Sequence, residues 1–481
     1  MDINYRLILS WLGSLVAFSA VLIILPGLID YFTLKTNKFV FFLLFLIVFF
    51  MGVLGFLANN SFNNKNFSKK DLLILIFLSW VILAGVLALP FKFSYVNLDY
   101  ADSYFEAMSA ITTTGSTTIV NLEDLSLGMH FYRASLQWSG GLAIIITSLL
   151  LGSVIGGMQK MFNLDSASLF SEKIKKIIFG ISIVYIMITV ITIFMLVFIA
   201  KLDLFEATIH SFSAISTTGF INKAGFNSWV DNPMAEFILL LAMFIGGLPY
   251  ILLYYLFFLR RKTLLQDAEV RGYIKLILIL IILATLWLTF NNGFNIFVAL
   301  RYAAFSIIAN LTGAGFTFMD PSRFGALFSI VGFLIMIIGG CHGSTASGVK
   351  IFRIQVAYIL IKHSIEKLFL KKHISIPIYN RNMLKEDFVF AIFAYFFIFF
   401  IALIIVALIL SALGVDFIAA FSIAGSSLAN VSVGLNEDLG YYGNFSGISD
   451  LGKWTLSAAM ILGRLDILGV VVLFNLKFWQ R

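Results

Sequence analysis

The chain has 481 residues, of which 60% are hydrophobic and only 12% are charged. An average soluble domain is about 25% charged, so this composition excludes an ordinary water-soluble enzyme. The formal net charge of +8 does not indicate a nucleic-acid partner, because Lys and Arg fall in short clusters between apolar segments. We therefore expect a polytopic membrane protein whose basic clusters face anionic lipids.

Long apolar segments recur along the whole chain, and each is long enough for a membrane-spanning helix. The first segment lacks the small-residue cleavage site of a signal peptide, so we expect it to be retained. Four shorter amphipathic segments lie between pairs of spans and are predicted to be re-entrant half-helices, at 101–114, 204–218, 297–314 and 417–432. The ten predicted spans are 7–29, 39–58, 72–91, 131–158, 177–200, 235–259, 274–290, 325–361, 388–413 and 454–476.

The arrangement of spans and half-helices repeats four times in the same direction. Most of the 33 Lys and Arg residues lie on one side, which predicts that both termini are cytoplasmic and that every half-helix enters from outside. Parallel repeats suit a pseudo-fourfold ring around a pore, whereas inverted repeats would suit alternating access. We expect an all-α protein with two N-terminal helices in 1–70 and pore repeats in 71–160, 161–265, 266–385 and 386–481.

A short polar turn follows each half-helix, and the four turns align on one glycine each. Glycine can take a positive φ, which lets successive carbonyls face one axis and replace the water shell of a cation. Small residues also allow close packing of helices, but the fourfold recurrence favours a filter for a monovalent cation. The candidate ion-binding residues are Thr113, Thr114, Gly115, Thr217, Thr218, Gly219, Gly313, Ala314, Gly315, Ser432, Val433 and Gly434.

The eighth apolar segment is interrupted at 339–349 by a glycine-rich sequence that cannot be helical throughout. Irregular backbone at membrane depth is tolerated where it is buried or lines a water-filled cavity, so we predict a gating loop beneath the filter. The alternative is a glycine kink without a gating role. A phosphate-binding loop is not indicated, because the lysine follows the last glycine one residue too late. The candidate gating residues here are Gly339, Gly340, Gly343, Gly348 and Lys350.

Arg464 lies near the middle of the last predicted span. A charge at that depth is costly unless it faces water or a partner, so we expect it to face the conduction path and oppose cation leak. Asp466 would point away from it on a helix, and we expect Lys350 or Arg353 to hold it. A purely structural ion pair is the alternative reading of Arg464.

The remaining polar residues give weaker signals. Glu106, Glu206 and His210 lie on half-helices, where we expect them to hold loops rather than bind ligands. An enzyme using His342 and Ser344 would need paired catalytic groups at fixed spacing, and the sequence offers none, so we expect no enzyme. The single cysteine excludes an internal disulfide or a zinc site built on thiolates. The basic stretch 362–385 is either a headgroup anchor or a docking surface.

The four turns, together with further motifs, resemble the membrane subunits of the Trk/Ktr/HKT potassium transporters, most closely the TrkH and TrkG branch. These motifs are QWSGG at 137–141, MFIGG at 243–247, GGCHGSTASGVK at 339–350 and GRLD at 463–466. The resemblance implies potassium uptake across the bacterial inner membrane, an intramembrane loop that blocks the pore until regulated, and a barrier role for Arg464. It also implies a homodimer and a ring of nucleotide-binding regulatory subunits of the TrkA type, with no organic cofactor in this chain.

Two turns depart from the family pattern. The third turn reads TGAGF where the family usually has TTTGY or TTSGY, and the fourth has Ser432 where the family often has glycine. Both changes concern the preference for potassium over sodium. A sodium-permeable or sodium-coupled transporter on the same fold therefore remains the alternative, and the sequence leaves passive and proton-coupled transport open.

Overall fold

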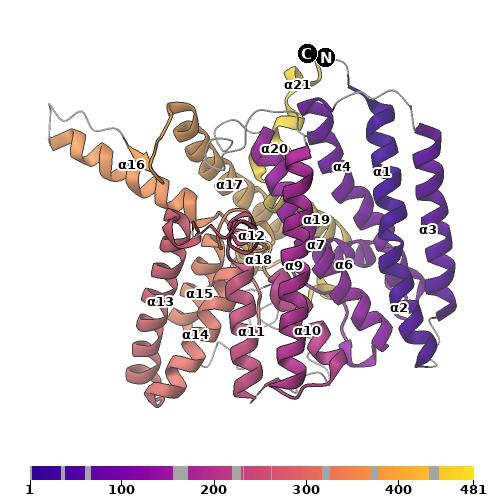
Figure 1. The fold of residues 1–481 in the computed structure, drawn as a ribbon, viewed down its shortest axis with the longest axis horizontal. Coiled ribbons are helices and arrows are strands. Elements are labelled where there is room, and N and C mark those ends of the chain that lie inside the picture. Colours follow the sequence, from indigo (N-terminus) through magenta and orange to yellow (C-terminus); the bar gives the residue numbers. More distant parts are fainter. Residues whose placement is uncertain are drawn as a thin grey trace.

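The computed structural model describes residues 3–33, 38–59, 67–154, 172–218, 229–230, 232–261, 263–316, 325–369, 377–432 and 444–480. Within these ranges, seven helices are long and apolar enough to cross a membrane. The two ends of the chain lie at the same end of the molecule (Figure 1). The protein is thus an all-α polytopic membrane protein, as its composition predicts.

The two N-terminal spans form a hairpin on the outside of the first repeat. The first span consists of α1 (Tyr5–Ser19) and α2 (Val21–Phe32), and the second is α3 (Lys38–Asn59). Buried Asp30 accepts hydrogen bonds from Ser126 Oγ and from the backbone N–H of Gly128, both at 2.9 Å. The Asp30 carboxylate therefore accepts from donors at the start of the fourth predicted span that have no partner within the helix. These bonds connect the hairpin to the core.

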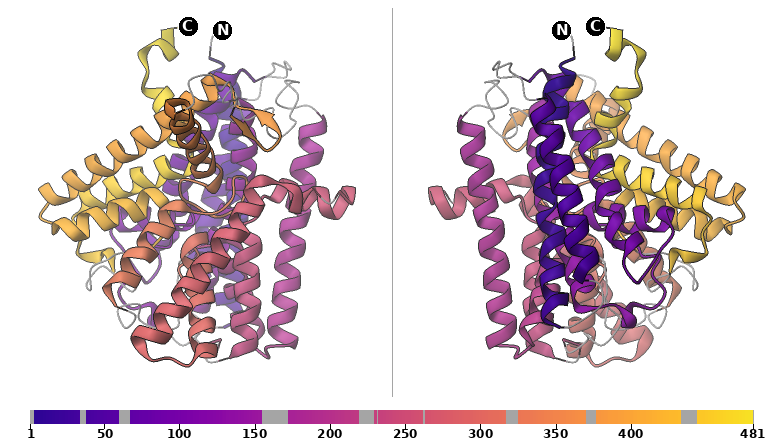
Figure 2. Two further views of the ribbon diagram at one scale, coloured as in Figure 1. Left: turned by 90° about the vertical axis from the view of Figure 1, so that its left-hand side faces the viewer. Right: turned by 90° about the vertical axis from the view of Figure 1, so that its right-hand side faces the viewer.

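Each of the four repeats contains a span, a half-helix and a second span (Figures 1 and 2). The first repeat has α4 (Lys69–Leu87), α5 (Leu89–Phe93), α6 (Tyr100–Ile111) and α7 (Leu127–Val154), and the second has α9 (Glu172–Phe198), α10 (Leu204–Ser216), α11 (Pro233–Gly246) and α12 (Tyr250–Leu259). The third has α13 (Ala268–Asn292), α14 (Ile296–Thr312), α15 (Ala326–Ile338) and α16 (Ile351–Phe369). The fourth has α17 (Glu386–Ala412), α18 (Phe417–Ala429), α19 (Asp450–Arg464) and α20 (Ile467–Val471).

Short elements complete the described chain. The strands β1 (Ile378–Tyr379) and β2 (Asn382–Met383) form an antiparallel hairpin between the third and fourth repeats. The remaining short helices are η1 (Leu122–Asp124), η2 (Leu264–Gln266), η4 (Phe445–Gly447), η5 (Val472–Phe474) and α21 (Leu476–Gln480).

The second span of each repeat packs against the half-helix of the next repeat, and the ring closes. Helix α7 contacts α10, α11 contacts α14, α15 contacts α18, and α19 contacts α6 of the first repeat. The side chains of Asp203, Asn295 and Asp416 cap the N-termini of three half-helices by accepting backbone N–H groups. All four half-helices are present within a few residues of their predicted bounds, which confirms the parallel repeats.

Three of the ten predicted spans are interrupted by a sharp bend or by a loop. The sixth bends by 98° between α11 and α12, where Pro249 disfavours helical backbone at the residue before it. The tenth bends by 111° between α19 and the following helix, next to Asp466, which has a φ of 60°. The eighth consists of α15 and α16, separated by the glycine-rich segment that was predicted to be irregular.

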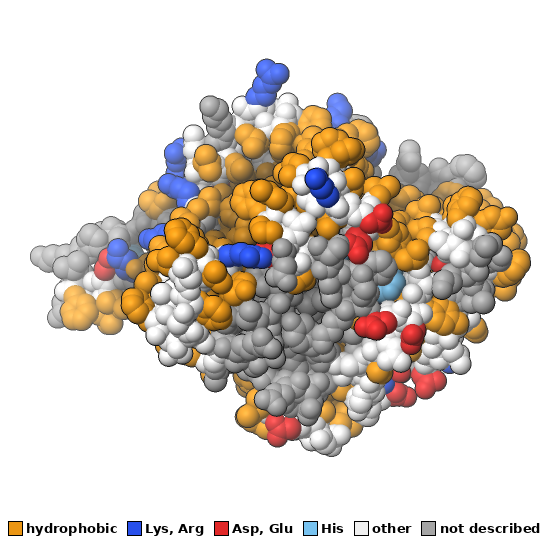
Figure 3. All heavy atoms as spheres, turned by 90° about the horizontal axis from the view of Figure 1, so that it is seen from below, with side chains coloured by type: hydrophobic (Ala, Val, Ile, Leu, Met, Phe, Trp, Pro, Cys, Tyr) orange, Lys and Arg blue, Asp and Glu red, His pale blue; other side chains and the backbone are white. Residues whose placement is uncertain are grey.

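The outer surfaces differ between the flanks and the end opposite the chain termini. Large apolar side chains are exposed along α3, α13 and α17, as expected for surfaces in contact with lipid. The end opposite the termini carries acidic side chains (Figure 3). Exposed carboxylates on the loops and half-helix starts are those of Asp99, Glu123, Asp124, Asp203, Asp416 and Asp450.

An ion pair between a buried lysine and a partly buried aspartate joins the fourth repeat to the first. Lys453 Nζ lies 2.5 Å from Asp102 Oδ1, and the Lys453 side chain is only 5% exposed. Replacing Lys453 with Met leaves the Asp102 carboxylate without its main partner. We therefore expect the free energy of unfolding to fall by about 3 kcal/mol. Thermal unfolding of the detergent-solubilised protein measures the loss.

The matched control is Lys92→Met. Lys92 lies 3.6 Å from Asp99, and the two side chains are 32% and 82% exposed. Solvent screens this pair, so its removal should cost less than about 1 kcal/mol. Equal losses for the two variants would contradict the role assigned to the pair of Lys453 and Asp102.

Candidate functional site: four turns, an intramembrane loop and Arg464

The four turns share one backbone conformation at the ends of their half-helices. Thr113, Thr217 and Asn430 have φ values of 53°, 51° and 52°, and Gly313 has a φ of 81°. The N–H of each of these residues bonds to the carbonyl three residues before it, at 3.0 to 3.2 Å. The next N–H in each turn bonds to the carbonyl five residues before it, at 2.8 to 3.0 Å. The C-terminal ends of the four half-helices are therefore equivalent in backbone structure.

This equivalence corrects the sequence alignment of the fourth turn. Asn430 occupies the place of Thr113, so Ser432 occupies the place of Gly115. Aligning the turns on Gly434 shifts the fourth turn by two residues. Gly115 and Gly315 have φ values of 88° and 60°, whereas Ser432 is not among the described residues with a positive φ. Gly219, Val433 and Gly434 lie outside the described residues.

The turns are close neighbours. Asn430 Nδ2 donates to Thr114 Oγ1 at 3.1 Å, which joins the fourth turn to the first. A Cβ added to Gly313 would lie 3.1 Å from Val431 Cγ2 and 3.8 Å from the Asn430 carbonyl oxygen, so the third turn adjoins the fourth. The third and fourth turns lack the hydroxyl that Thr114 and Thr218 provide in the first two.

Glycines on the second spans allow the half-helix ends to approach the helices behind them. A Cβ on Gly140 would lie 2.0 Å from the Ile111 carbonyl oxygen, and one on Gly463 would lie 2.0 Å from that of Leu428. A Cβ on Gly246 would lie 3.0 Å from the Ile215 carbonyl oxygen. These carbonyls occupy the same position in three turns, so three of the sequence motifs serve one packing function.

The segment between α15 and α16 is a compact loop closed at its base by glycine. Gly339 and Gly348 have φ values of 74° and 86°, and a Cβ on Gly339 would lie 1.8 Å from the Ser347 carbonyl oxygen. The N–H groups of Val349 and Lys350 bond to the carbonyls of Ile337 and Ile338 at 2.8 and 2.9 Å. The end of α15 and the start of α16 are therefore adjacent, and the loop begins and ends at the same place.

The tip of the loop contacts the second repeat. Thr345 Oγ1 lies 2.9 Å from the carbonyl oxygens of both Ile215 and Gly246, to which it can donate. The N–H of Thr345 bonds to Gly246 O at 3.1 Å, and that of Cys341 bonds to Gly247 O at 3.1 Å. Because Ile215 lies directly before the second turn, the loop is hydrogen-bonded to the base of that turn.

Arg464 joins the loop to the first turn. Its Nη1 donates to Ser347 Oγ at 2.5 Å, and its Nη2 donates to Thr113 Oγ1 at 2.6 Å and to Thr345 O at 2.9 Å. It is the last residue of α19 rather than the middle of a continuous span, which corrects the sequence prediction. The guanidinium thus lies between the first turn and the loop.

Asp466 is paired with Arg353, one of the two partners predicted. Arg353 Nη2 lies 2.5 Å from Asp466 Oδ2, and the Arg353 guanidinium carbon lies 3.8 Å from the centre of the Tyr395 ring. Asp466 was predicted to point away from Arg464 because both residues were placed on one continuous helix. The helix bends after Arg464, so that argument does not apply. This pair connects α16, α17 and the bend between α19 and α20.

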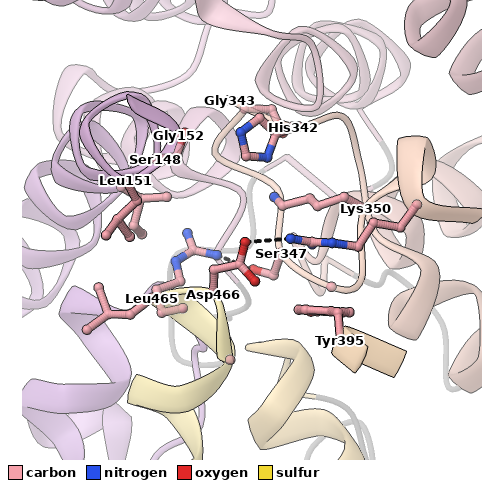
Figure 4. A pocket seen from close by; sticks show the side chains of 16 residues that line it. Ser148, Leu151, Gly152, His342, Gly343, Ser347, Lys350, Tyr395, Leu465 and Asp466 are labelled. Atoms are coloured by element: carbon pink, nitrogen blue, oxygen red, sulfur yellow. Dashed lines mark hydrogen bonds and ion pairs between the residues drawn. The ribbon is translucent and has the colours of Figure 1, made fainter. Parts of the chain in front are cut away.

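A cavity of about 50 Å³ lies between the intramembrane loop and the bend after α19 (Figure 4). Lys350, Arg353 and Arg464 line it, with Asp466 as the carboxylate among them. The Lys350 ammonium folds back onto the carbonyl of Ala346. Three basic side chains thus line this cavity together with one carboxylate.

Two buried carboxylates hold the segments on either side of the turns. Glu269 Oε1 accepts from the N–H groups of His342 at 2.7 Å and Phe352 at 3.3 Å, which ties both ends of the loop to α13. Glu106 Oε1 accepts from the N–H groups of Thr118 at 2.7 Å and Ile119 at 3.3 Å, just after the first turn. Glu106 thus holds a loop, as predicted, whereas no sequence pattern indicated a role for Glu269.

The sequence profile of the TrkH family, described as a cation transport protein, matches residues 36–481. This chain belongs to the TrkH family. It is 34% identical over 420 residues to the Trk system potassium uptake protein TrkI of Halomonas elongata, covering 85% of this chain and 84% of that protein. It is 31% identical over 488 residues to the Trk system potassium uptake protein TrkH of Salmonella typhimurium, covering 99% and 100%.

The fold agrees with a solved member of the TrkH family. The crystal structure of the potassium transporter TrkH from Vibrio parahaemolyticus matches with a TM-score of 0.90 at 25% identity, covering 99% of both chains. The relatives carry the names of transport proteins rather than enzymes. The family predicted from the motifs is therefore confirmed.

Proposed function

We propose that this TrkH-family chain is the ion-translocating subunit of a Trk-type potassium uptake system in the bacterial inner membrane. The observation that carries the proposal is the fourfold backbone equivalence of the turns ending α6, α10, α14 and α18. Each turn presents carbonyls at the C-terminal end of a half-helix, where the helix dipole is negative. The names of the relatives supply the ion, since each is a potassium transporter.

The turns suit an ion that loses water easily. No acidic residue occurs among residues 112–115, 216–219, 312–315 and 430–434, so carbonyl and hydroxyl oxygens rather than carboxylates would surround the ion. Such uncharged ligands favour a monovalent cation over a divalent one. We place the ion-binding positions at the predicted residues of the first three turns. In the fourth turn the backbone register places them at Asn430, Val431 and Ser432 instead of at Val433 and Gly434.

A sodium-permeable transporter on the same fold is the second candidate. It is favoured by Ser432 at a glycine position and by Ala314 and Val431 at hydroxyl positions. A turn without its glycine can hold its carbonyls at a different distance from the axis. Potassium would still be the preferred ion if the first two turns dominate the geometry.

Uptake by proteoliposomes separates the two functions. We expect rubidium or potassium uptake at least about tenfold faster than sodium uptake at equal concentration, corresponding to about 1.4 kcal/mol of discrimination. Equal or faster sodium uptake would support the second candidate. Absence of uptake of either ion by a folded preparation would contradict both.

We propose that the loop at 339–349 and Arg464 form the gate. Gly339, Gly340, Gly343 and Gly348 give the loop its compact shape, while Arg464 places a positive charge beneath the turns. Movement of the loop would break the contacts of Thr345 and Ser347 together and open the path. We propose cytoplasmic termini, repeats with the predicted bounds, a homodimer and a TrkA-type regulatory ring as the setting in which this gate is controlled.

A further inference from the structure

Asn430 stands at the junction of the first and fourth turns. It follows the last residue of α18 with a φ of 52°, and it is only 1% exposed. Asparagine is, after glycine, a frequent residue at such a left-handed helix end. Among the four equivalent residues, it alone carries a carboxamide, which is long enough to reach a neighbouring turn.

The orientation of the Asn430 carboxamide follows from its partners. Nδ2 donates to Met460 O at 2.8 Å and to Thr114 Oγ1 at 3.1 Å. A backbone carbonyl can only accept, so the amide nitrogen rather than the oxygen must face Met460. Both N–H groups are therefore used, one toward α19 and one toward the first turn.

Hydrogen bonds then continue in one direction through the first turn. Thr112 Oγ1 donates its only proton to Met108 O at 2.7 Å. The contact of 2.8 Å between Thr112 Oγ1 and Thr114 Oγ1 therefore requires Thr114 to donate. Thr114 accepts from Asn430 and donates to Thr112, so its hydroxyl is fixed in both roles.

The second turn provides an internal comparison. Ser216 Oγ donates to Phe212 O at 2.7 Å and lies 2.8 Å from Thr218 Oγ1, which reproduces the hydroxyl pair of the first turn. Within the described residues, no amide side chain from another turn donates to Thr218. The link from one turn to another is thus a property of the Asn430 and Thr114 pair.

We propose that Asn430 is a positioning residue for ion selection, which acts by holding the first and fourth turns in register through Thr114. The fourth turn needs such a link because Val431 supplies no hydroxyl and Ser432 replaces a glycine. The inference rests on the proposed transport function. Without the link, the carbonyls of the two turns can separate, and the ring then fits potassium less closely than before.

The test is a double-mutant cycle in proteoliposomes, read as the ratio of rubidium to sodium uptake. We expect Asn430→Ala to lower this ratio by about tenfold and Thr114→Val by about fivefold, because each removes hydrogen bonds near the ion path. The ratio of rubidium to sodium uptake in the double variant should equal that of Asn430→Ala alone, since both substitutions break the same hydrogen-bonded link. Thr218→Val is the control, and its effect should multiply with that of Asn430→Ala.

The outcomes separate the inference from the proposed function. A ratio within twofold of wild type in folded Asn430→Ala, or effects of Asn430→Ala and Thr114→Val that multiply, would overturn the inference. If Asn430→Ala does not fold, Thr114→Val decides alone, and an unchanged ratio overturns the inference. A wild-type protein that transports neither ion would instead overturn the proposed function.

Discussion

Arg464→Ala is expected to raise potassium flux through the isolated protein by about ten- to thirtyfold. Two like charges about 8 Å apart at an effective dielectric constant of about 20 repel by about 2 kcal/mol, which corresponds to about thirtyfold in rate. The substitution also removes the three hydrogen bonds that connect Ser347, Thr345 and Thr113 through the guanidinium. Rubidium flux into proteoliposomes measures the change.

Arg464→Lys is the matched variant, because it keeps the charge while losing the forked geometry that reaches loop and turn together. Flux in this variant should stay within about fivefold of wild type if charge is the main barrier, since about 1 kcal/mol of lost hydrogen bonding corresponds to about fivefold in rate. Unchanged flux in folded Arg464→Ala would contradict the barrier role and leave Arg464 as a structural residue.

Gly140→Ala is expected to abolish most potassium uptake, with a loss of at least about tenfold. The added methyl carbon would lie 2.0 Å from the Ile111 carbonyl oxygen and 2.9 Å from its Cα, which are backbone atoms at the end of α6. Relief of that overlap requires α6 and α7 to separate, and overpacking of this kind costs about 1–3 kcal/mol or more. The first turn directly follows the displaced residue, so the ion path changes as well.

Gly447→Ala is the control for this substitution. No atom lies within 4 Å of a Cβ built on Gly447, and its φ is not in the left-handed region. The free energy of unfolding of this variant should lie within about 0.5 kcal/mol of the wild-type value, as is usual for surface substitutions. Its potassium uptake should equal that of wild type. Wild-type uptake by Gly140→Ala would contradict the close packing between the half-helix and the second span.

The helices could be predicted because their signals are local. Segment length and hydropathy indicated the spans, and the position of the polar turns indicated where each half-helix ends. The fourth turn was misaligned because Gly434 was chosen as its reference. Counting from the N-cap would have avoided this, since Asp203 and Asp416 precede Thr217 and Asn430 by the same fourteen residues.

Features that depend on distant contacts were not predictable. The bend at Asp466 needs a positive φ, which is uncommon for any residue other than glycine, and the bond to Arg353 supports it from another repeat. Glu269 bonds to His342 across 73 residues of sequence, so no local pattern reveals it as an anchor of the loop. Pro249, by contrast, was a visible signal for the bend after α11 that hydropathy alone obscured.

The central claim is that the four turns surround one cation with backbone oxygens. Anomalous diffraction from crystals of the protein soaked in rubidium tests it directly. We expect a rubidium peak on the common axis, about 3 Å from carbonyl oxygens contributed by all four turns, at the level of Thr114, Thr218, Ala314 and Val431. A well-ordered structure with no peak on that axis, or with rubidium bound by one or two turns away from it, would contradict the claim.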